Sequence, residues 1–498
     1  MRYVSTRGDL EEKRSAQAII KGLAPDKGLY VPTKMPKLQM EFEHMSGAAY
    51  NEIAFRIMRE FLSDFEEEEL RRCTDGAYDE KFDTPKIAPL VATKNAFFLE
   101  LYHGRTAAFK DMALSILPYL LTYSVRKEKE DKKVVILTAT SGDTGKAALE
   151  GFSDVSGTEI FVFYPVDGVS EIQKRQMVTQ RGANTHVFAI KGNFDDAQAG
   201  VKAIFNDEAF ATRLAAEDYK LSSANSINIG RLIPQIAYYF YAYIQLIDSG
   251  KIVSGDEINI SVPTGNFGNI LAAFYAKEMG LPVKTLICAS NENRVLADFI
   301  NSGVYDANRI FYLTSSPSMD ILVSGNLERL LWHLSGENSW EIARCMTELE
   351  TTGKYTVSDK IKDGMSCFYG GFANMDKAHA AIRALWEGEQ YLIDTHTAVA
   401  YSVYSDYREK TGDGTPTVVA STASAYKFAD RVIECLGLPK PENEFDAIDA
   451  LREATGIPTP AGLRGLGDKK IIHGDIVAKS EMADIVEQRL SALRASVN

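Results

Sequence analysis

The chain has 498 residues, of which 45% are hydrophobic and 25% are charged. This composition is typical of a globular protein, and the length favours two or three domains. The 55 basic and 68 acidic side chains give a net charge of −13, which argues against a nucleic-acid surface because such a surface needs a basic patch. The five cysteines are scattered without metal-ligand or redox spacing, so we expect reduced core residues in a cytoplasmic protein.

The N-terminal part of the chain, up to about residue 83, has mostly helical patterning. Residues 1–14 contain no apolar segment and carry acidic groups, so no secretory signal is expected. Helices are predicted at 46–62 and from the acidic stretch 64–70. These carboxylates have no neighbouring histidine, so a solvated helix start is favoured over a metal site. Two strand-like runs follow, at 88–92 and 96–101.

A strongly amphipathic helix is predicted directly after Lys110. Lys110 lies in the first turn beside the apolar stripe, where the helix dipole does not favour a cation. Partial burial would favour the neutral amine, which can form a Schiff base. A solvated surface lysine is the simpler interpretation of this segment alone. The apolar positions are Phe109, Met112, Ala113, Ile116, Leu117, Leu120 and Leu121.

Strands and helices then alternate along the chain. Strands are predicted at 134–138, 159–164, 185–190, 258–262, 283–288 and 417–420. Helices are predicted at 194–206 and 232–246, and the second is too short to cross a bilayer. The alternation indicates an α/β fold with parallel sheets, in which ligands bind where the strands end.

The turn at 139–148 follows a predicted strand and is rich in small and hydroxyl residues. Backbone amides at such a strand-to-helix turn favour an anion. A nucleotide-binding P-loop would need glycine at Thr140 and a hydroxyl residue at Ala147, so a P-loop is not expected.

Three further turns are candidates for binding. The turn at 263–271 suits a phosphate, but it lacks the glycine spacing of a dinucleotide site. The segment 222–231 ends in Arg231 and suits a carboxylate or phosphate, and a capped helix start with a surface arginine is an equal alternative. Ser421 and Thr422 follow the last strand, where an ordinary N-cap is the simplest interpretation.

A lysine before a helix, two anion-binding turns and a hydroxyl at a third strand end together fit pyridoxal phosphate. The chain closely resembles the threonine synthases, which are fold-type II pyridoxal-phosphate enzymes. The resemblance covers nearly the whole chain and includes segments 3–8, 21–32, 222–231, 324–329 and 394–399.

The resemblance implies a tryptophan synthase β-like α/β fold of two open, twisted domains with a helical N-terminal extension. Residues 1–92 would form the mostly helical N-terminal domain. Residues 93–250 would carry the Schiff-base lysine and the carboxylate loop. Residues 251–498 would form a larger α/β domain with the cofactor phosphate loop and a C-terminal extension.

The resemblance also assigns roles to residues around the cofactor. Lys110 would form the Schiff base and move protons. Thr422 would contact the pyridine nitrogen, with Ser421 as the second choice, and Asp143 would lie near the ring oxygen. The cofactor phosphate would be held by Thr264, Gly265, Asn266, Phe267, Gly268 and Asn269. No metal is expected.

Two groups of residues are expected to bind the substrate. Its carboxylate would be held by Ser141, Gly142, Thr144 and Gly145, with Thr106 nearby. Its phosphate would be held by Asn225, Ser226, Asn228 and Arg231, and Arg105 and Lys146 are further cationic candidates. Three positions depart from the common family pattern: Arg105 replaces a usual proline, and Ser424 and Ala425 replace a frequent histidine and proline. His103 and His396 are expected to have structural roles.

The implied reaction converts O-phospho-L-homoserine and water into L-threonine and phosphate, the last step of threonine biosynthesis. The alternatives are a serine or threonine dehydratase and a catalytically silent relative. A small-molecule substrate, no nucleic-acid or membrane partner, and a cytoplasmic monomer or homodimer are expected.

Overall fold

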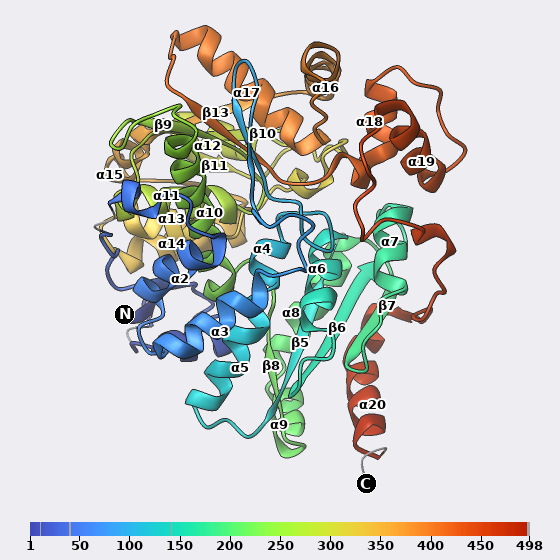
Figure 1. Cartoon of the computed structure of the whole chain (residues 1–498). Coiled ribbons are helices and arrows are strands. Elements are labelled where there is room, and N and C mark those ends of the chain that lie inside the picture. Colours follow the sequence, from blue (N-terminus) through green and yellow to red (C-terminus); the bar gives the residue numbers. More distant parts are fainter. Residues whose placement is uncertain (10, 39–40, 141, 496–498) are drawn as a thin grey trace.

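Two parallel sheets dominate the computed structural model, which describes residues 1–9, 11–38, 41–140 and 142–495 (Figure 1). The larger sheet has the order β13-β10-β9-β14-β4-β3, and β3 alone is antiparallel to its neighbour among these described strands. Its strands are β3 (Leu90–Ala92), β4 (Phe97–Glu100), β9 (Ile258–Pro263), β10 (Val283–Ser290), β13 (Phe368–Phe372) and β14 (Thr417–Ser421).

The smaller sheet is parallel throughout its described strands, in the order β15-β7-β6-β5-β8. These are β5 (Lys133–Ala139), β6 (Thr158–Pro165), β7 (Thr185–Lys191), β8 (Tyr219–Ser222) and β15 (Ile476–Ala478). Every residue of β6 is buried, which explains the apolar run from Ile160 to Pro165 that follows its first two residues. The predicted α/β class is confirmed.

The sheets are not built from contiguous parts of the chain. β4 pairs with β14, although more than 300 residues separate them, and β15 adds the C-terminal segment to the smaller sheet. Both strands cross the boundary predicted at residue 250. Two small ribbons complete the strands: β1 (Tyr3–Ser5) with β2 (Tyr30–Pro32), and β11 (Val304–Asp306) with β12 (Lys354–Thr356).

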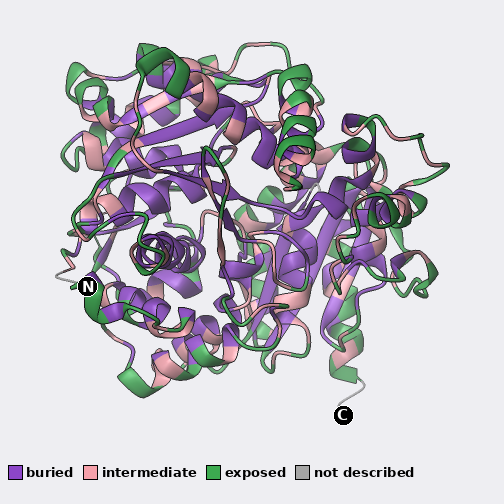
Figure 2. Cartoon of the chain, turned by 45° about the horizontal axis from the view of Figure 1, so that its top comes forward, coloured by how far each residue is buried: buried purple, intermediate pink, exposed green. Residues whose placement is uncertain are grey.

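Helices cover both sheets, and buried strands run through the centre of each layer in Figure 2. The N-terminal helices are α1 (Ser15–Lys21), α2 (Tyr50–Phe61) and α3 (Glu67–Ala77). The smaller sheet carries α5 (Leu117–Lys127), α6 (Asp143–Phe152), α7 (Glu171–Val178), α8 (Phe194–Asn206), α9 (Glu208–Ala216) and α20 (Met482–Ala495). The remaining helices include α10 (Ile229–Asp248), α11 (Gly268–Met279), α12 (Val295–Ser302), α13 (Leu327–Leu334), α14 (Ser339–Thr352), α15 (Asp359–Gly364), α16 (Met375–Glu389), α17 (Thr395–Thr411), α18 (Ala429–Cys435) and α19 (Glu444–Thr455).

The helix predicted after Lys110 is interrupted. α4 (Asp111–Leu114) ends after one turn, and α5 begins at Leu117 with Pro118 in its first turn. Proline has no amide hydrogen and is favoured where a helix starts, so it marks the new beginning. The helix predicted at 46–62 also begins later, at Tyr50, because residues Phe42–Met45 form a separate 3-10 turn.

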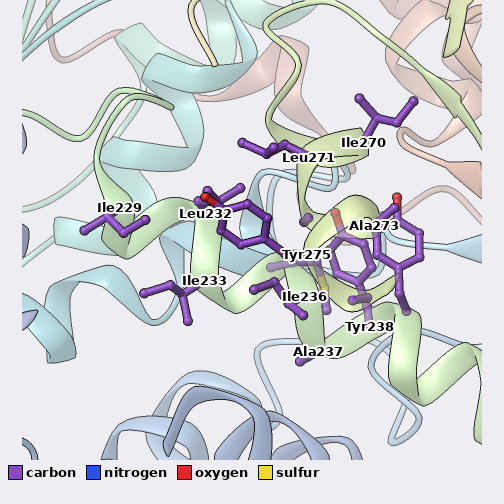
Figure 3. Packing of buried hydrophobic residues seen from close by; sticks show 14 of the residues in the cluster. Ile229, Leu232, Ile233, Ile236, Ala237, Tyr238, Ile270, Leu271, Ala273 and Tyr275 are labelled. Carbon is purple, nitrogen blue, oxygen red and sulfur yellow. The ribbon is translucent and has the colours of Figure 1, made fainter. Parts of the chain in front are cut away.

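The central helix α10 packs against α11 in the core. Figure 3 shows the apolar side chains of the two helices in contact, among them Ile233, Ile236 and Tyr275. α10 is buried over most of its length, which accounts for the hydrophobic run at 232–246. None of the described helices is long and apolar enough to cross a membrane. The packing fixes α10 so that its N-terminal end lies at the pocket described next.

Candidate active site

A pocket lies at the carboxyl ends of β9 and β14 and at the N-terminal ends of α6, α10 and α11. The pocket is open to solvent on one side, and its walls combine apolar residues with a few converging polar and charged groups, as ligand sites do. It is lined by Phe109, Lys110, Asp143, Thr144, Ser226, Arg231, Gln235, Pro263, Thr264, Gly265, Asn266, Phe267, Gly268, Asn269, Ser318, Met319, His396, Thr422 and Ala423.

Lys110 immediately precedes α4, and its amine is directed at the start of α6. Its Nζ lies 3.2 Å from Asp143 Oδ2 and 3.4 Å from Ser318 Oγ. Burial lowers the pKa of Lys110, Lys427 and Arg231 lower it further, and Asp143 opposes them. The environment therefore favours a neutral, nucleophilic amine more than water does.

The two carboxylate oxygens of Asp143 have different partners. Oδ1 lies 2.7 Å from Lys427 Nζ and accepts a hydrogen bond from Gln173 Nε2 at 2.8 Å. Oδ2 faces the pocket, where it contacts Lys110 and accepts from Ser318 Oγ at 3.3 Å. Burial alone would raise the pKa of Asp143, but Lys427 and Lys110 hold it well below its usual range. Asp143 is therefore a fixed negative charge beside Lys110.

The turn between β9 and α11 forms the opposite wall. Phe267 adopts a left-handed backbone (φ 62°), and α11 begins at the next residue, Gly268. A Cβ at Gly265 would lie 2.6 Å from the backbone oxygen of Ser318, whereas a Cβ at Gly268 would meet nothing closer than 3.5 Å. A Cβ at Gly268 would therefore make only ordinary van der Waals contacts, and this position lies at a helix N-terminus, where backbone amides favour a phosphate.

Two side-chain donors near the pocket lack partners within the described protein. Nε of Arg231 and Nδ2 of Asn269 are buried without a hydrogen-bond acceptor. Arg231 is only 3% exposed, and its Nη1 donates to the backbone oxygen of Ala224 at 2.9 Å. Burial lowers the pKa of Arg231 to about 10. Unsatisfied buried donors are costly, so the pocket fits anionic ligand groups at these two places.

Twelve of the residues expected from the sequence line the pocket. They are Lys110, Asp143, Thr144, Ser226, Arg231, Thr264, Gly265, Asn266, Phe267, Gly268, Asn269 and Thr422. Ser421, the second choice at the last strand, is buried with its hydroxyl 3.2 Å from that of Thr397. Thr422 is therefore the hydroxyl residue that the geometry offers to a ligand.

Several expected substrate residues are engaged elsewhere. The amides of Gly142 and Gly145 both donate to Thr140 Oγ1 at 2.9 Å, so the turn satisfies them internally. Thr106 donates to Asp111 through its amide and its hydroxyl, at 2.8 and 2.6 Å. None of Gly142, Gly145 and Thr106 lines the pocket. Ser141, also expected to hold the carboxylate, lies outside the described residues.

The expected phosphate group of residues is also divided. Asn228 caps α10 by accepting from the Gly230 amide at 2.9 Å, and its Nδ2 donates to the backbone oxygens of Ile19 and Ser223. Asn225 does not line the pocket. Ser226 and Arg231 remain as the two members of this segment that a ligand in the pocket would meet.

The two further cationic candidates turn away from the pocket. Arg105 and Lys146 both bind Glu150, at 3.1 and 2.9 Å. Burial would raise the pKa of Glu150, but Lys146 and Arg105 lower it to about 2. Their charges are thus balanced on the outer side of α6. Ser424, at the other departure from the family pattern, caps a 3-10 turn (Ala425–Phe428), and Ala425 is buried.

Four polar residues at or behind the pocket were not assigned to it from the sequence: Ser318, Gln235, His396 and Lys427. His396 Nδ1 contacts Asp394 Oδ2 at 2.8 Å, and its Nε2 accepts from the Ser318 amide at 3.1 Å. His396 thereby anchors the 316–319 turn over Lys110. Lys427 could have been found from the sequence, because a lysine among the apolar residues 425–428 indicates a buried charge. Ser318 could not, because the 316–319 turn carries no motif. No cluster of three or more potential metal-binding side chains occurs in the described parts of the chain.

Three family models match consecutive parts of the chain. They are described as "Threonine synthase N terminus" at residues 2–78, "Pyridoxal-phosphate dependent enzyme" at 82–357 and "Threonine synthase, C-terminal" at 397–470.

Similar proteins include threonine synthases from bacteria and fungi. The protein from Pseudomonas aeruginosa is 39% identical over 87% of this chain and 90% of its own length, and that from Eremothecium gossypii is 34% identical over 98% of both chains. Threonine synthase-like 1 from Macaca fascicularis is 39% identical over 87% of this chain, and this chain spans only 60% of that relative's length. Similarity to mammalian relatives thus extends over only part of their chains.

Solved structures share the whole architecture. The pyridoxal-phosphate-bound threonine synthase from Brucella melitensis has a TM-score of 0.86 at 36% identity and covers 98% of each chain. The yeast threonine synthase has a TM-score of 0.87 at 31% identity and covers 99% of each chain.

Proposed function

Because the chain belongs to the threonine synthase family of pyridoxal-phosphate-dependent enzymes, we propose that it converts O-phospho-L-homoserine and water into L-threonine and phosphate. The choice of a phosphorylated substrate rests on one observation: Arg231, whose Nε has no hydrogen-bond partner, lines the same pocket as Lys110. A planar, charged donor fork in a buried site suits a phosphate, whereas a dehydratase acting on serine or threonine needs no second anion site.

The pocket residues fit pyridoxal phosphate, which supplies an electron sink that stabilises negative charge on the substrate carbons when it is bound. The uncrowded position of Gly268 at the start of α11 and the unpaired Nδ2 of Asn269 support a phosphate site on the turn from Thr264 to Asn269. Lys110 would hold the cofactor covalently, and Thr422 would face its ring nitrogen. Asp143 would lie on the side of Lys110.

The chain's own contribution is to place charges and move protons. Lys110 would also be the base, because burial, Lys427 and Arg231 lower the pKa of its amine and so favour the neutral form that can accept a proton. Ser318 lies within 3.4 Å of that amine and holds the Asp143 side of the pocket in place. Arg231 would bind the leaving phosphate group and stabilise the charge that develops on its departure.

A direct test incubates the purified chain and pyridoxal phosphate with O-phospho-L-homoserine and quantifies threonine and phosphate together. Equal amounts of the two products support the proposal. Phosphate accompanied by a 2-oxo acid would indicate elimination without addition of water, as in a dehydratase-type enzyme. Neither product would indicate a silent relative, and borohydride trapping of cofactor on Lys110 would then show whether the site still binds it. Lys110→Ala is the control and should give no threonine.

Three broader expectations belong to the same proposal. We place the protein in the cytoplasm, where the five unpaired cysteines would remain reduced. We also propose a monomer or a homodimer. We further propose three domains, residues 1–92, 93–250 and 251–498. In this division, β4 of the second domain pairs in the larger sheet, and β15 of the third domain pairs in the smaller sheet.

A further inference from the structure

Lys427 is a second buried lysine behind the candidate active site. It lies in the 3-10 turn Ala425–Phe428 that follows β14, and its side chain is 0% exposed. None of the roles proposed above requires it. A lysine is almost never fully buried unless its charge is paired, so its position calls for a physical explanation.

The ammonium group of Lys427 joins three separate segments. Its Nζ lies 2.7 Å from Asp143 Oδ1 at the start of α6 and donates to the backbone oxygen of Thr106 at 3.0 Å. It also donates to Gln176 Oε1 of α7 at 3.4 Å. The lysine therefore ties the end of the larger sheet to the smaller sheet and to the loop that leads to Lys110.

These contacts fix one oxygen of Asp143 and leave the other for the pocket. Lys427 and Gln173 hold Oδ1 from behind, while Oδ2 contacts Lys110 and Ser318. Without Lys427, the carboxylate would keep Lys110 as its nearest cation and would lose its main fixed anchor. Because the site is buried, the charges of Asp143 and Lys427 strongly affect how readily the Lys110 amine holds a proton.

We propose that Lys427 is a positioning residue that, through Asp143, sets the orientation and the proton affinity of the group formed by Lys110 and its cofactor. The proposal rests on the proposed attachment of the cofactor to Lys110. The charged groups that act on Lys110 from the surrounding elements are Asp143 of α6, Lys427 and Arg231 of α10. The charge of Lys427 also acts on Asp111 of α4. Burial raises the pKa of Asp111 to about 6, although Thr106 and Lys427 oppose the rise.

The first test is a pH titration of the visible absorption band of the holoenzyme, without substrate. Lys427→Gln removes a cation beside Lys110 and leaves Asp143 negative, so the midpoint should rise by about one pH unit or more. Lys427→Arg keeps the charge and should restore a midpoint near that of the wild type.

Lys146→Gln is the matched control. Lys146 is also a buried lysine paired with a carboxylate, Glu150, but it does not contact Asp143 or Lys110. Its substitution should lower stability and leave the spectroscopic midpoint unchanged. A Lys427→Gln enzyme that behaves in the same way would overturn the proposal, because Lys427 would then have only a structural role.

A second measurement covers the case in which Lys427→Gln alone fails to fold. The double variant Asp143→Asn/Lys427→Gln removes both charges and leaves no unpaired buried carboxylate. Compared with Asp143→Asn, it should shift the midpoint by clearly less than one unit, because only the direct charge effect of Lys427 on Lys110 remains once Asp143 is neutral. A further shift as large as about one unit would overturn the proposal. Since no phosphorylated substrate is used, the outcome is independent of whether the chain makes threonine.

Discussion

Arg231 is a charge whose burial is only partly compensated by the protein. One of its nitrogens donates to Ala224, another has no acceptor, and burial lowers its pKa to about 10. Buried cations without a counter-ion reduce stability, and such residues persist at functional sites where a ligand supplies the missing interaction. The proposed ligand is the phosphate of the substrate.

We expect Arg231→Met to separate stability from activity. Removing the buried charge should raise the unfolding free energy of the apoprotein by about 1–2 kcal/mol. Losing the charged contact should weaken binding of the transition state by about 2–5 kcal/mol, so kcat/KM for O-phospho-L-homoserine should fall roughly 30-fold or more. Denaturant titration and steady-state kinetics measure the two effects.

A matched substitution sharpens that comparison. Arg231→Lys keeps the charge and loses the planar fork, so its kcat/KM should lie between those of the wild type and the methionine variant. An unchanged kcat/KM in Arg231→Met would contradict the phosphate assignment and favour a dehydratase-type substrate.

Single residues also show where prediction from the sequence stopped. Lys110 and the 264–269 turn were found because a lysine before an amphipathic helix and a glycine turn after a strand are local patterns. Ser318 and His396 reach the same pocket through contacts between distant segments, which no local pattern encodes. Asn228 looked like a ligand, but Asn is also a preferred N-cap, and its side chain is used in that way.

At the scale of elements, the pocket depends on how closely the 316–319 turn approaches the glycine turn after β9. Ser324 Oγ and the Asn326 side chain, which follow the 316–319 turn in the chain, donate to Gly265 O and Asn266 O at 2.8 and 3.0 Å, so they join the glycine turn to the segment after that turn. Their spacing leaves no room for a side chain at Gly265 and leaves space at Gly268.

The two glycines should therefore respond differently to alanine. Gly265→Ala places a Cβ 2.6 Å from the Ser318 backbone oxygen, so it should destabilise the apoprotein by about 1–3 kcal/mol and weaken cofactor binding. Gly268→Ala should leave apoprotein stability nearly unchanged and weaken cofactor binding, because its methyl group would occupy the proposed phosphate site. Thermal unfolding and titration with pyridoxal phosphate measure both. Tight cofactor binding by Gly268→Ala would contradict the phosphate site.

The end of β4 is joined to the preceding loop by an ion-paired histidine. His103 Nδ1 lies 2.6 Å from Asp83 Oδ1, and Nε2 lies 2.9 Å from Glu100 Oε2. Burial alone would lower the pKa of His103, but the two carboxylates raise it to about 9. His103 is therefore charged at neutral pH and acts in structure, as expected from the sequence.

This pKa gives the stability a defined pH dependence. A folded-state value of about 9 lies above the ordinary 6.5, so the stabilisation is complete below pH 6.5 and is lost as the pH rises through 9. Between pH 6.5 and 10, the wild type should lose about 1–3 kcal/mol of unfolding free energy relative to His103→Gln.

His333 provides the control for this measurement. Burial lowers its pKa to about 4, so it is neutral in the folded protein over this window and neutral in the unfolded chain above about pH 7.5. Above about pH 7.5, His333→Gln should leave the slope of stability against pH as it is in the wild type. Parallel curves for the wild type and His103→Gln would contradict the ion-paired state of His103.

The sequence predicted many elements, because buried parallel strands are continuous apolar runs and caps mark helix starts. The strand β13 was missed because its sequence contains Gly370 and Gly371, which favour a turn. The structure explains the first glycine, since a Cβ there would lie 2.6 Å from the Ala297 backbone oxygen of α12. Close packing between elements thus overrides the local preference of the sequence.

For the whole molecule, the two sheets meet with their carboxyl ends at one pocket, and the C-terminal segment returns to the smaller sheet. Figure 1 shows α20 beside β7 and away from α4. β15 and α20 lie beyond residue 470, where the matched C-terminal family model ends. The sequence could not show this return, because the pairing of β15 with β7 joins residues almost 300 positions apart.

We expect the C-terminal helix to contribute to stability without contributing to the pocket. Leu490 and Val486 are 0% exposed and pack in the cluster under the smaller sheet. Leu490→Ala should lower the unfolding free energy by about 2–4 kcal/mol and leave kcat little changed. Ser491→Ala, on the exposed side of α20, should change stability by less than about 0.5 kcal/mol. A large loss of kcat in folded Leu490→Ala enzyme would instead couple this helix to the active site.

The most direct test of the central claim is to run the reaction in water enriched in oxygen-18 and to analyse both products by mass spectrometry. The account predicts that the label enters the hydroxyl group of threonine, because water adds to carbon, while the released phosphate stays unlabelled. Label in the phosphate with homoserine as the other product would show hydrolysis at phosphorus and would contradict the proposed function.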